Sequence, residues 1–232
     1  MPRPHRGRFL AGDSNLSRYA SRLGATEINS SFYRPHLVTT YAKWAGSVPP
    51  AFRFSVKIPQ EITHDLRLVG TGKVLDRFLA QTEGLGRKLG CLLLQLPPSL
   101  AFDARSAGRF FAALRKRHEG PVVAEPRHAS WLTPAAETLL VAARIGRVAA
   151  DPPRAALDAD PGGWEGVAYY RLHGSPVIYR SSYEPARLRT LASRIDESAR
   201  KSRQVWCIFD NTTLGAATAN ALELARLLRR KL

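Results

Sequence analysis

The chain has 232 residues, of which 44% are hydrophobic, and a formal net charge of +16 at neutral pH. This size suits one α/β domain, and no apolar stretch approaches the ~20 residues of a membrane-spanning helix. The basic N-terminal segment lacks the apolar core of a secretory signal, and the two cysteines lack metal-ligand spacing. We therefore expect a cytoplasmic protein and predict neither a metal nor an organic cofactor. The alternative is a metal site built from His64, His128 and His173 with Glu27, Glu125, Asp151 and Asp210, although these residues show no clustered ligand pattern.

Short apolar runs that end in polar residues recur along the chain and predict strands. In chain order they are Ala25–Phe32, Arg53–Pro59, Leu89–Pro97, Pro121–Arg127, Arg147–Asp151, Val167–Gly174 and Gln204–Asn211. Each is rich in β-branched or bulky apolar residues and is followed by turn formers or a helical pattern. This arrangement is typical of parallel strands in repeated strand–helix units.

Helical patterns occupy the gaps between these runs. Asn15 resembles an N-cap before apolar residues at helical spacing, Asp103 predicts a second cap, and Thr133 with Pro134 predicts a third. The last of these helices should run to about Arg144. The other predicted helices are Val38–Ala45, Gly72–Lys88, Ala186–Ser202 and Leu214–Lys231.

The alternation of strands and helices continues without a linker or a change in composition. We therefore predict one domain over residues 15–232, preceded by an irregular basic segment over residues 1–14. An open doubly wound sheet would alternate in the same way, but no nucleotide-binding glycine motif follows any strand, and the polar strand ends are spread over all seven strands. These features favour a TIM-like (β/α) barrel of the α/β class.

Seven strands are one fewer than a complete TIM barrel has, and Met1–Leu10 contains no convincing strand. We therefore expect the barrel to lack or alter its first strand. The consequence would be a gap between the Ala25 strand and the Gln204 strand. Unpaired strand edges invite association, so a homodimer could seal this gap.

Six segments in order resemble a known family. They are Glu27–Tyr33, Phe52–Lys57 with Thr63-His64, Leu93–Pro98, Ala124–Trp131, Tyr170–Gly174 and Phe209–Asn211. Together they resemble the domain-of-unknown-function 72 family, also called YecE-like, from about Asn15 to the C-terminus. The resemblance implies a TIM-barrel-like fold, and no biochemical activity is firmly assigned to the family. Members usually begin with a strand ending in a Gly-Thr-Ser-Gly-Trp-like segment, which this chain lacks.

Three predicted strands end in a pair of polar residues at spacing i, i+2, so both members of each pair point the same way. The pairs are Glu27 with Asn29, Glu125 with Arg127, and Arg171 with His173. We expect them to meet in one pocket at the carboxyl end of the barrel, where Lys57 could act as a base, a nucleophile or an oxyanion partner. The predicted catalytic residues are Lys57, Glu125, His173 and Asp210. The predicted substrate-binding residues are Glu27, Asn29, Tyr33, His64, Gln95, Arg127, His128, Trp131, Arg171 and Asn211. Phe32 and Tyr170 are further aromatic residues expected near the mouth. The alternative is a purely structural polar network.

Lysine and arginine side chains suit phosphate or carboxylate, and carboxylates with amides suit hydroxyl groups. We expect the arginines to keep some donors free for a ligand. The sequence thus favours an enzyme that acts by acid/base or hydrolytic chemistry, as a hydrolase, lyase or isomerase, on a small anionic substrate that is phosphorylated or sugar-like. One alternative is a nucleic-acid-associated protein that uses its basic surface, which is less favoured because the basic residues are spread along the chain. Another is a non-catalytic ligand-binding barrel.

Overall fold

The computed structural model describes residues 3–153 and 160–229, and it has an α/β fold with two largely parallel sheets. One sheet has the order β1-β2-β3-β4-β5-β7 and the other has the order β6-β8-β9. Every ladder is parallel except the short one between β5 and β7. The strands are β1 Ala25–Ile28, β2 Arg53–Lys57, β3 Leu89–Gln95, β4 Val122–Glu125, β5 Gly146–Arg147, β6 Ala149–Asp151, β7 Gly162–Gly163, β8 Val167–Leu172 and β9 Gln204–Phe209.

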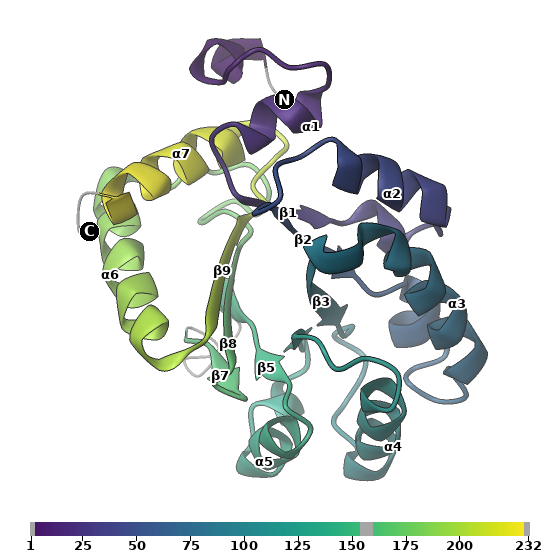
Figure 1. Ribbon diagram of the computed structural model, residues 1–232. Coiled ribbons are helices and arrows are strands. Elements are labelled where there is room, and N and C mark those ends of the chain that lie inside the picture. Colours follow the sequence, from purple (N-terminus) through teal and green to yellow (C-terminus); the bar gives the residue numbers. More distant parts are fainter. Residues whose placement is uncertain (1–2, 154–159, 230–232) are drawn as a thin grey trace.

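The helices lie outside the strands, which curve around a common centre (Figure 1). They are α1 Asn15–Ala20, α2 Val38–Gly46, α3 Gly72–Thr82, α4 Ala104–Arg115, α5 Pro134–Ala142, α6 Pro185–Lys201 and α7 Ala216–Arg229. The predicted caps Asp103 and Thr133 accept hydrogen bonds from the backbone of Ser106 and Ala136, whereas Ser14 rather than Asn15 caps α1. The predicted end of the last helix at Lys231 lies outside the described residues.

The two sheets are joined by the chain itself between β5 and β6. The N–H of Val148 donates to the carbonyl of Ala124 in β4 at 2.9 Å, and Ala149 one residue later pairs with Tyr170 in β8. The predicted strand Arg147–Asp151 is therefore two short strands that pair with different neighbours. The two-residue strand β7 was not predicted from the sequence.

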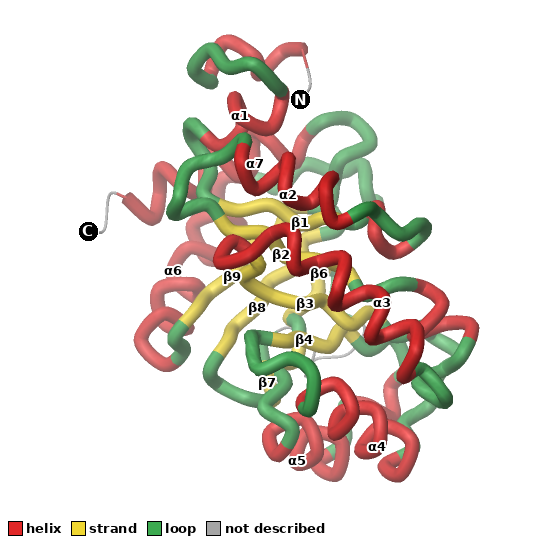
Figure 2. Tube along the Cα trace, turned by 45° about the vertical axis from the view of Figure 1, so that its right-hand side comes forward, coloured by secondary structure: helices red, strands yellow, loops and turns green. Residues whose placement is uncertain are grey.

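Apolar residues form three clusters that follow these layers. One lies between the first sheet and helices α1 to α5, and another lies between β6, β8, β9 and helices α6 and α7 (Figure 2). A third lies on the inner face, where Cys91, Val123, Tyr169 and Trp206 pack across the space between the sheets. A side chain at Gly90 would meet the Trp206 ring at 2.6 Å, so a glycine there lets β9 approach β3 closely.

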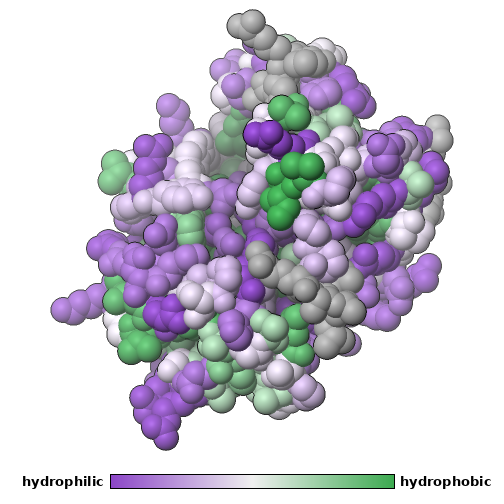
Figure 3. All heavy atoms as spheres, turned by 180° about the vertical axis from the view of Figure 1, so that it is seen from behind, coloured by the Kyte–Doolittle hydropathy of each residue, from purple (hydrophilic) through white to green (hydrophobic). Residues whose placement is uncertain are grey.

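At the other side of the fold, β1 and β9 are the outermost strands of their sheets. Within residues 3–153 and 160–229 no ladder joins them. Before β1 the chain forms a 3-10 helix at Arg3–Arg8 and the helix α1, which lie outside the sheets (Figure 1). No helix in the described part of the chain is both long and apolar enough to cross a membrane. The face in Figure 3 is mostly hydrophilic, with small separate apolar patches.

Candidate functional site

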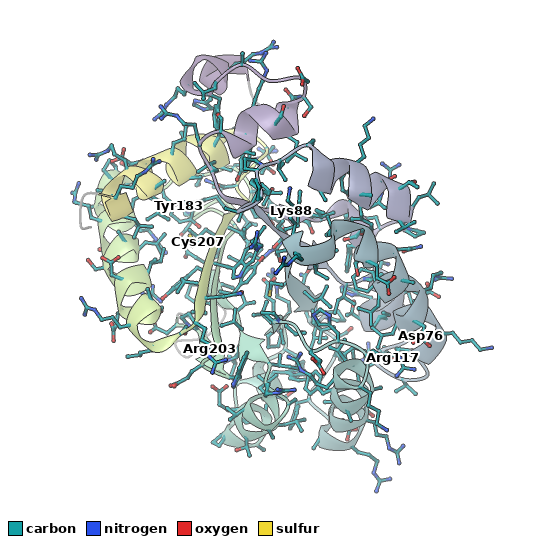
Figure 4. All side chains as sticks on the ribbon, viewed as in Figure 1. Asp76, Lys88, Arg117, Tyr183, Arg203 and Cys207 are labelled. Atoms are coloured by element: carbon teal, nitrogen blue, oxygen red, sulfur yellow. The ribbon has the colours of Figure 1, made fainter. Side chains whose placement is uncertain are left out.

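Arg171, near the end of β8, is the centre of a buried polar cluster. Its guanidinium donates to both oxygens of Glu27 at 2.8–3.2 Å and to Glu125 at 3.0 Å, and it pairs with Asp210 at 3.0 Å. Its side chain is only 2% exposed. These partners come from β1, from the end of β4 and from the residue after β9, so one arginine connects four strands. Figure 4 shows nitrogen- and oxygen-bearing side chains gathered in the middle of the fold.

His173 lies between two carboxylates of this cluster. Its Nδ1 is 3.1 Å from Asp210 and its Nε2 is 3.0 Å from Glu125. Burial disfavours the charged imidazolium, but the hydrogen bonds with Asp210 and Glu125 outweigh burial, so the pKa of His173 is raised. Burial also opposes ionisation of Glu125, but Arg171 and His173 together hold the pKa of that carboxyl well below its usual range. The cluster therefore stabilises carboxylates and favours a protonated histidine.

Lys57, at the end of β2, is a buried ammonium group without a hydrogen-bond acceptor in the described parts of the chain. Its Nζ lies 3.9 Å from the centre of the Phe32 ring, and the residue is 5% exposed. Burial and the charge of Arg171 together lower the pKa of Lys57 to about 8, against the opposing pull of the nearby carboxylates. A lysine in this state can release a proton near neutral pH.

Arg127 lies two residues after β4 and is nearly buried, with 10% of its side chain exposed. One of its terminal nitrogens pairs with Glu125 and lies 3.0 Å from Nε2 of His173. Its Nε is buried and has no hydrogen-bond partner among residues 3–153 and 160–229. Arg127 thus retains donor capacity inside the protein, whereas buried donors are normally satisfied.

The cluster has an excess of positive charge and unused hydrogen-bond donors. Three cationic residues, Lys57, Arg127 and Arg171, meet three carboxylates, Glu27, Glu125 and Asp210, and a protonated His173 adds a fourth positive charge. Arg171 directs its nitrogens to all three carboxylates, contrary to the expectation that it keeps donors free for a ligand. The unused donors belong to Lys57 and Arg127.

A cavity of about 320 Å³ borders the cluster between β1 and β9. Its wall includes Glu27 and Asn29 from the first sheet and Asp210 from the second. The side chain of Asn29 makes no hydrogen bond with any described residue, and its Oδ1 is buried. The predicted gap between the outer strands is therefore a cavity that reaches the polar cluster.

Three other predicted residues lie around this cluster without hydrogen bonds to it. Gln95 ends β3 beside Glu125, and its amide has no partner in the described residues. His64 bonds to Thr63 and packs on the Phe32 ring at 5.0 Å, while burial and the charge of Lys57 lower its pKa. Tyr33 packs on the other side of Phe32 and is 76% exposed. These residues form an outer aromatic and polar border beside Lys57.

Four predicted residues have structural contacts instead. His128 caps the short turn at Ala129–Trp131 through the Ser130 N–H, and Trp131 is buried against Phe111 with its indole N–H bonded to the carbonyl of Leu100. Asn211 donates to the Ser181 carbonyl and to the Asn220 side chain. The hydroxyl of Tyr170 bonds to Ser198 on α6, on the outer face of the sheet. The structure does not bring these side chains into the polar cluster.

Two residues in the site were not predicted. The Tyr169 hydroxyl donates to Glu27 at 2.8 Å and bonds to the Ser55 hydroxyl at 2.9 Å, and Tyr179 packs edge-on against His173 with ring centres 5.8 Å apart. The alternation in β8 could have identified Tyr169, because it points the same way as Arg171 and His173. Tyr179 lies in the loop between β8 and α6, where no periodicity marks it.

The described side chains offer no group of three or more His, Cys, Asp and Glu arranged to hold a metal ion. The carboxylates that might serve are already bonded to Arg171 and His173. The fold and the cluster together define an α/β protein with a buried polar site at the carboxyl ends of parallel strands.

Comparison with known proteins identifies the family. A family model described as "Protein of unknown function DUF72" matches residues 6–232, so the chain belongs to this family. The UPF0759 protein YunF of Bacillus subtilis is 24% identical over 94% of this chain and 88% of its own length. The resemblance found in the sequence motifs is thus confirmed.

Solved structures of the same family have similar folds. A DUF72 family protein of Enterococcus faecalis matches with a TM-score of 0.80 at 20% identity, covering 93% of this chain and 88% of that one. Another, from Thermotoga maritima, matches with a TM-score of 0.75 at 25% identity, covering 89% and 85%. These similarities support the α/β fold.

Proposed function

We propose that this protein is an enzyme that performs acid/base chemistry on a small anionic substrate at the carboxyl ends of its strands. The proposal includes a TIM-like barrel that is open between β1 and β9. The strand order around the two sheets, the inner apolar cluster and the outer layer of helices support this barrel. Active sites of such barrels lie at the carboxyl ends of the strands, which is where the polar cluster lies.

The observation that carries the proposal is the pair of buried cations with unused donors. Lys57 and the Nε of Arg127 have no hydrogen-bond acceptor among the described residues, whereas Arg171 is bonded to three carboxylates. A buried donor left without an acceptor costs about 1–3 kcal/mol, and more when the donor is charged. An anionic group that accepts from both residues would remove this cost. Phosphate and carboxylate oxygens are such acceptors.

The groups beside these cations can transfer protons. His173 is held between Asp210 and Glu125 and favours the protonated form, so it can act as an acid. Lys57, with a pKa of about 8, can act as a base or stabilise a developing negative charge. An acid and a base on opposite sides of one anionic substrate suit isomerisation, elimination or hydrolysis.

Anion binding can be tested by thermal unfolding with inorganic phosphate, sulfate or malonate at fixed ionic strength. At a hundredfold excess over Kd, binding stabilises the folded state by about 2.7 kcal/mol, which for a chain of this size raises Tm by roughly 5–10 °C. We expect this rise in the wild type. Lys57→Met and Arg127→Met should each lose most of the rise.

Arg117→Ala is the matched control, because Arg117 is a surface arginine in the turn after α4 that pairs with Asp76 of α3 at 2.5 Å (Figure 4). This variant should keep the full response to phosphate. The proposal fails if no anion stabilises the wild type, or if Arg127→Met responds as strongly as Arg117→Ala. A response that also disappears in Arg117→Ala would point to nonspecific binding on the basic surface and would overturn the assignment to this site.

A further inference from the structure

The cavity between β1 and β9 has the walls of a binding site for hydroxyl groups. We infer that it is a subsite for the polyol or sugar part of a substrate whose anionic part is held by Lys57 and Arg127, and it meets the polar cluster at Glu27 and Asp210. This inference rests on the proposed function. It adds the class of molecule, a phosphorylated or carboxylated polyhydroxy compound.

The polar part of the wall has unused hydrogen-bonding groups. The Oδ2 of Asp210 accepts from Arg171 and His173, but no described group donates to its Oδ1. The amide of Asn29 and the hydroxyls of Thr212 and Thr218 also have no partner in the described parts of the chain, and all four residues line the cavity. Such a set of mixed donors and acceptors matches neighbouring hydroxyl groups, each of which both donates and accepts.

The charge on the wall favours a neutral ligand group over a second anion. Glu27 and Asp210 are the charged residues of this lining, and both are paired with Arg171. Arg171 thereby compensates their negative charges, but the lining itself contains no lysine, arginine or histidine. An anionic group should therefore bind to Lys57 and Arg127, and the uncharged hydroxyl-bearing part should occupy the cavity.

The rest of the wall is apolar, as a sugar ring requires. Tyr19 and Phe209 line the cavity together with Ala217 and Ala221 from α7. The hydroxyl of Tyr19 bonds to the carbonyl of Ala25 at 3.0 Å, which fixes the ring in place. Aromatic and methyl surfaces can cover the C–H faces of a sugar, while the volume of about 320 Å³ lies at the lower end of the roughly 300–1,000 Å³ typical of ligand sites.

Asp210 connects the subsite to the proposed chemistry. One of its oxygens holds Nδ1 of His173 at 3.1 Å, and its carboxylate also borders the cavity. A substrate hydroxyl bonded to Asp210 would therefore lie close to the histidine. This arrangement predicts that the reacting carbon is the one next to the hydroxyl at Asp210, between the anionic end and the polyol end of the substrate.

The inference can be tested by isothermal titration calorimetry with inorganic phosphate, neutral D-ribose and D-glucitol, and D-ribose 5-phosphate as probes. We expect the sugar phosphate to bind at least tenfold more tightly than inorganic phosphate. Thr218→Val and Thr212→Val keep the side-chain shape but remove the hydroxyl, and each should weaken sugar phosphate binding by about fivefold to tenfold while leaving phosphate affinity unchanged. Thr213→Val is the matched control, because Thr213 is an exposed neighbour that does not line the cavity.

The outcomes separate this inference from the proposed function. If inorganic phosphate binds but Thr218→Val and Thr212→Val bind the sugar phosphate like the wild type, the subsite is wrong and the anion site stands. If no anion binds while the neutral sugars bind in a way that Thr218→Val abolishes, the proposed anionic substrate is wrong and the hydroxyl subsite stands. Circular dichroism of each variant establishes that it is folded.

Discussion

The two sheets meet in two places that are built differently. Between β5 and β6 the chain passes from one sheet to the other, and the backbone of Val148 continues the hydrogen bonding to β4. Between β1 and β9 no ladder forms in the described residues, and side chains make the connection instead. There Arg171 bonds to Glu27 on β1 and pairs with Asp210 after β9, and Tyr169 adds a second bond to Glu27.

The difference shows how stability and binding are divided over the fold. A connection made by backbone hydrogen bonds satisfies the N–H and C=O groups that form it and involves no charged group. Where charged side chains make the connection, Lys57 and the Nε of Arg127 have no hydrogen-bond acceptor among the described residues. A cavity also lies beside Asp210. The junction between β1 and β9, called here the side-chain junction, is therefore the part of the fold that is suited to a ligand. The one between β5 and β6, the backbone junction, is suited to holding the sheets together.

Breaking the side-chain junction at its centre should have the largest effect. Arg171→Leu leaves Glu27, Glu125 and Asp210 buried without their common partner. We expect a loss of about 3–5 kcal/mol in the free energy of unfolding, measured by urea denaturation. Arg117→Ala, which removes an exposed pair with Asp76, should cost far less, because exposed ion pairs are screened by water and salt. Equal losses in the two variants would contradict the structural role given to Arg171.

Crowding the backbone junction should have the next largest effect. A methyl group at Gly146 in β5 would lie 2.8 Å from the Val167 carbonyl oxygen and 3.2 Å from a methyl of Val123. We expect Gly146→Ala to destabilise by about 1–3 kcal/mol in the same assay. Gly108→Ala in α4 is the control, because its new methyl meets only Leu139 of α5, at an ordinary contact distance of 3.7 Å. This substitution should stabilise the protein by about 0.5–1 kcal/mol. A tolerated Gly146→Ala would mean that this junction can relax.

Much of the site could be predicted because strand geometry fixes side-chain direction. Residues at spacing i, i+2 share a face, so the positions of Glu125 and Arg127, and of Arg171 and His173, followed from the sequence. The same reasoning should have included Tyr169. The predicted strands also match the observed ones in place, although the ends extend two to four residues less far in most of them.

Other features depend on contacts that are distant in the sequence. The direction of Trp131 in a turn is set by packing on Phe111, so its position after a strand did not reveal that it is buried. Every nitrogen of Arg171 is bonded only because three carboxylates from other strands lie within reach of it. The strand β7 exists because two glycines pair with β5, which no local pattern indicates.

Weakening the side-chain junction by one hydroxyl should have a smaller effect than removing Arg171. Tyr169→Phe keeps the ring packed on Trp206 but removes the hydroxyl that bonds to Glu27 and to the Ser55 side chain. We expect a loss of about 1–2 kcal/mol in the free energy of unfolding. Combining Tyr169→Phe with Arg171→Leu should cost less than the sum of the two single losses, since both act on Glu27. Full additivity would show that the two side chains hold the junction independently.

The smallest expected effect is a difference in pH dependence between the two junctions. The pKa of His173 is raised in the folded state, so the folded protein binds more protons than the unfolded chain above about pH 6.5. The stability supplied by His173 is therefore complete below that pH and is lost as the pH rises through the folded value, with a slope of at most about 1.4 kcal/mol per pH unit. Lys57 acts in the opposite sense, because its pKa is lowered to about 8, but its contribution changes only above that pH.

Comparing the wild type with His173→Gln by urea denaturation between pH 6 and 7.5 isolates this histidine, because the lowered pKa values of His36, His64 and His118 act in the opposite sense in both proteins. The stability of the wild type should fall over this range relative to that of His173→Gln, which keeps a polar side chain but cannot titrate at this position. Gly146→Ala should lower the whole curve and keep its slope, because it changes packing and no titratable group. A stability difference between the wild type and His173→Gln that does not change over this range would mean that the histidine does not carry its proton in the folded cluster, and its assignment as the acid would be lost with it.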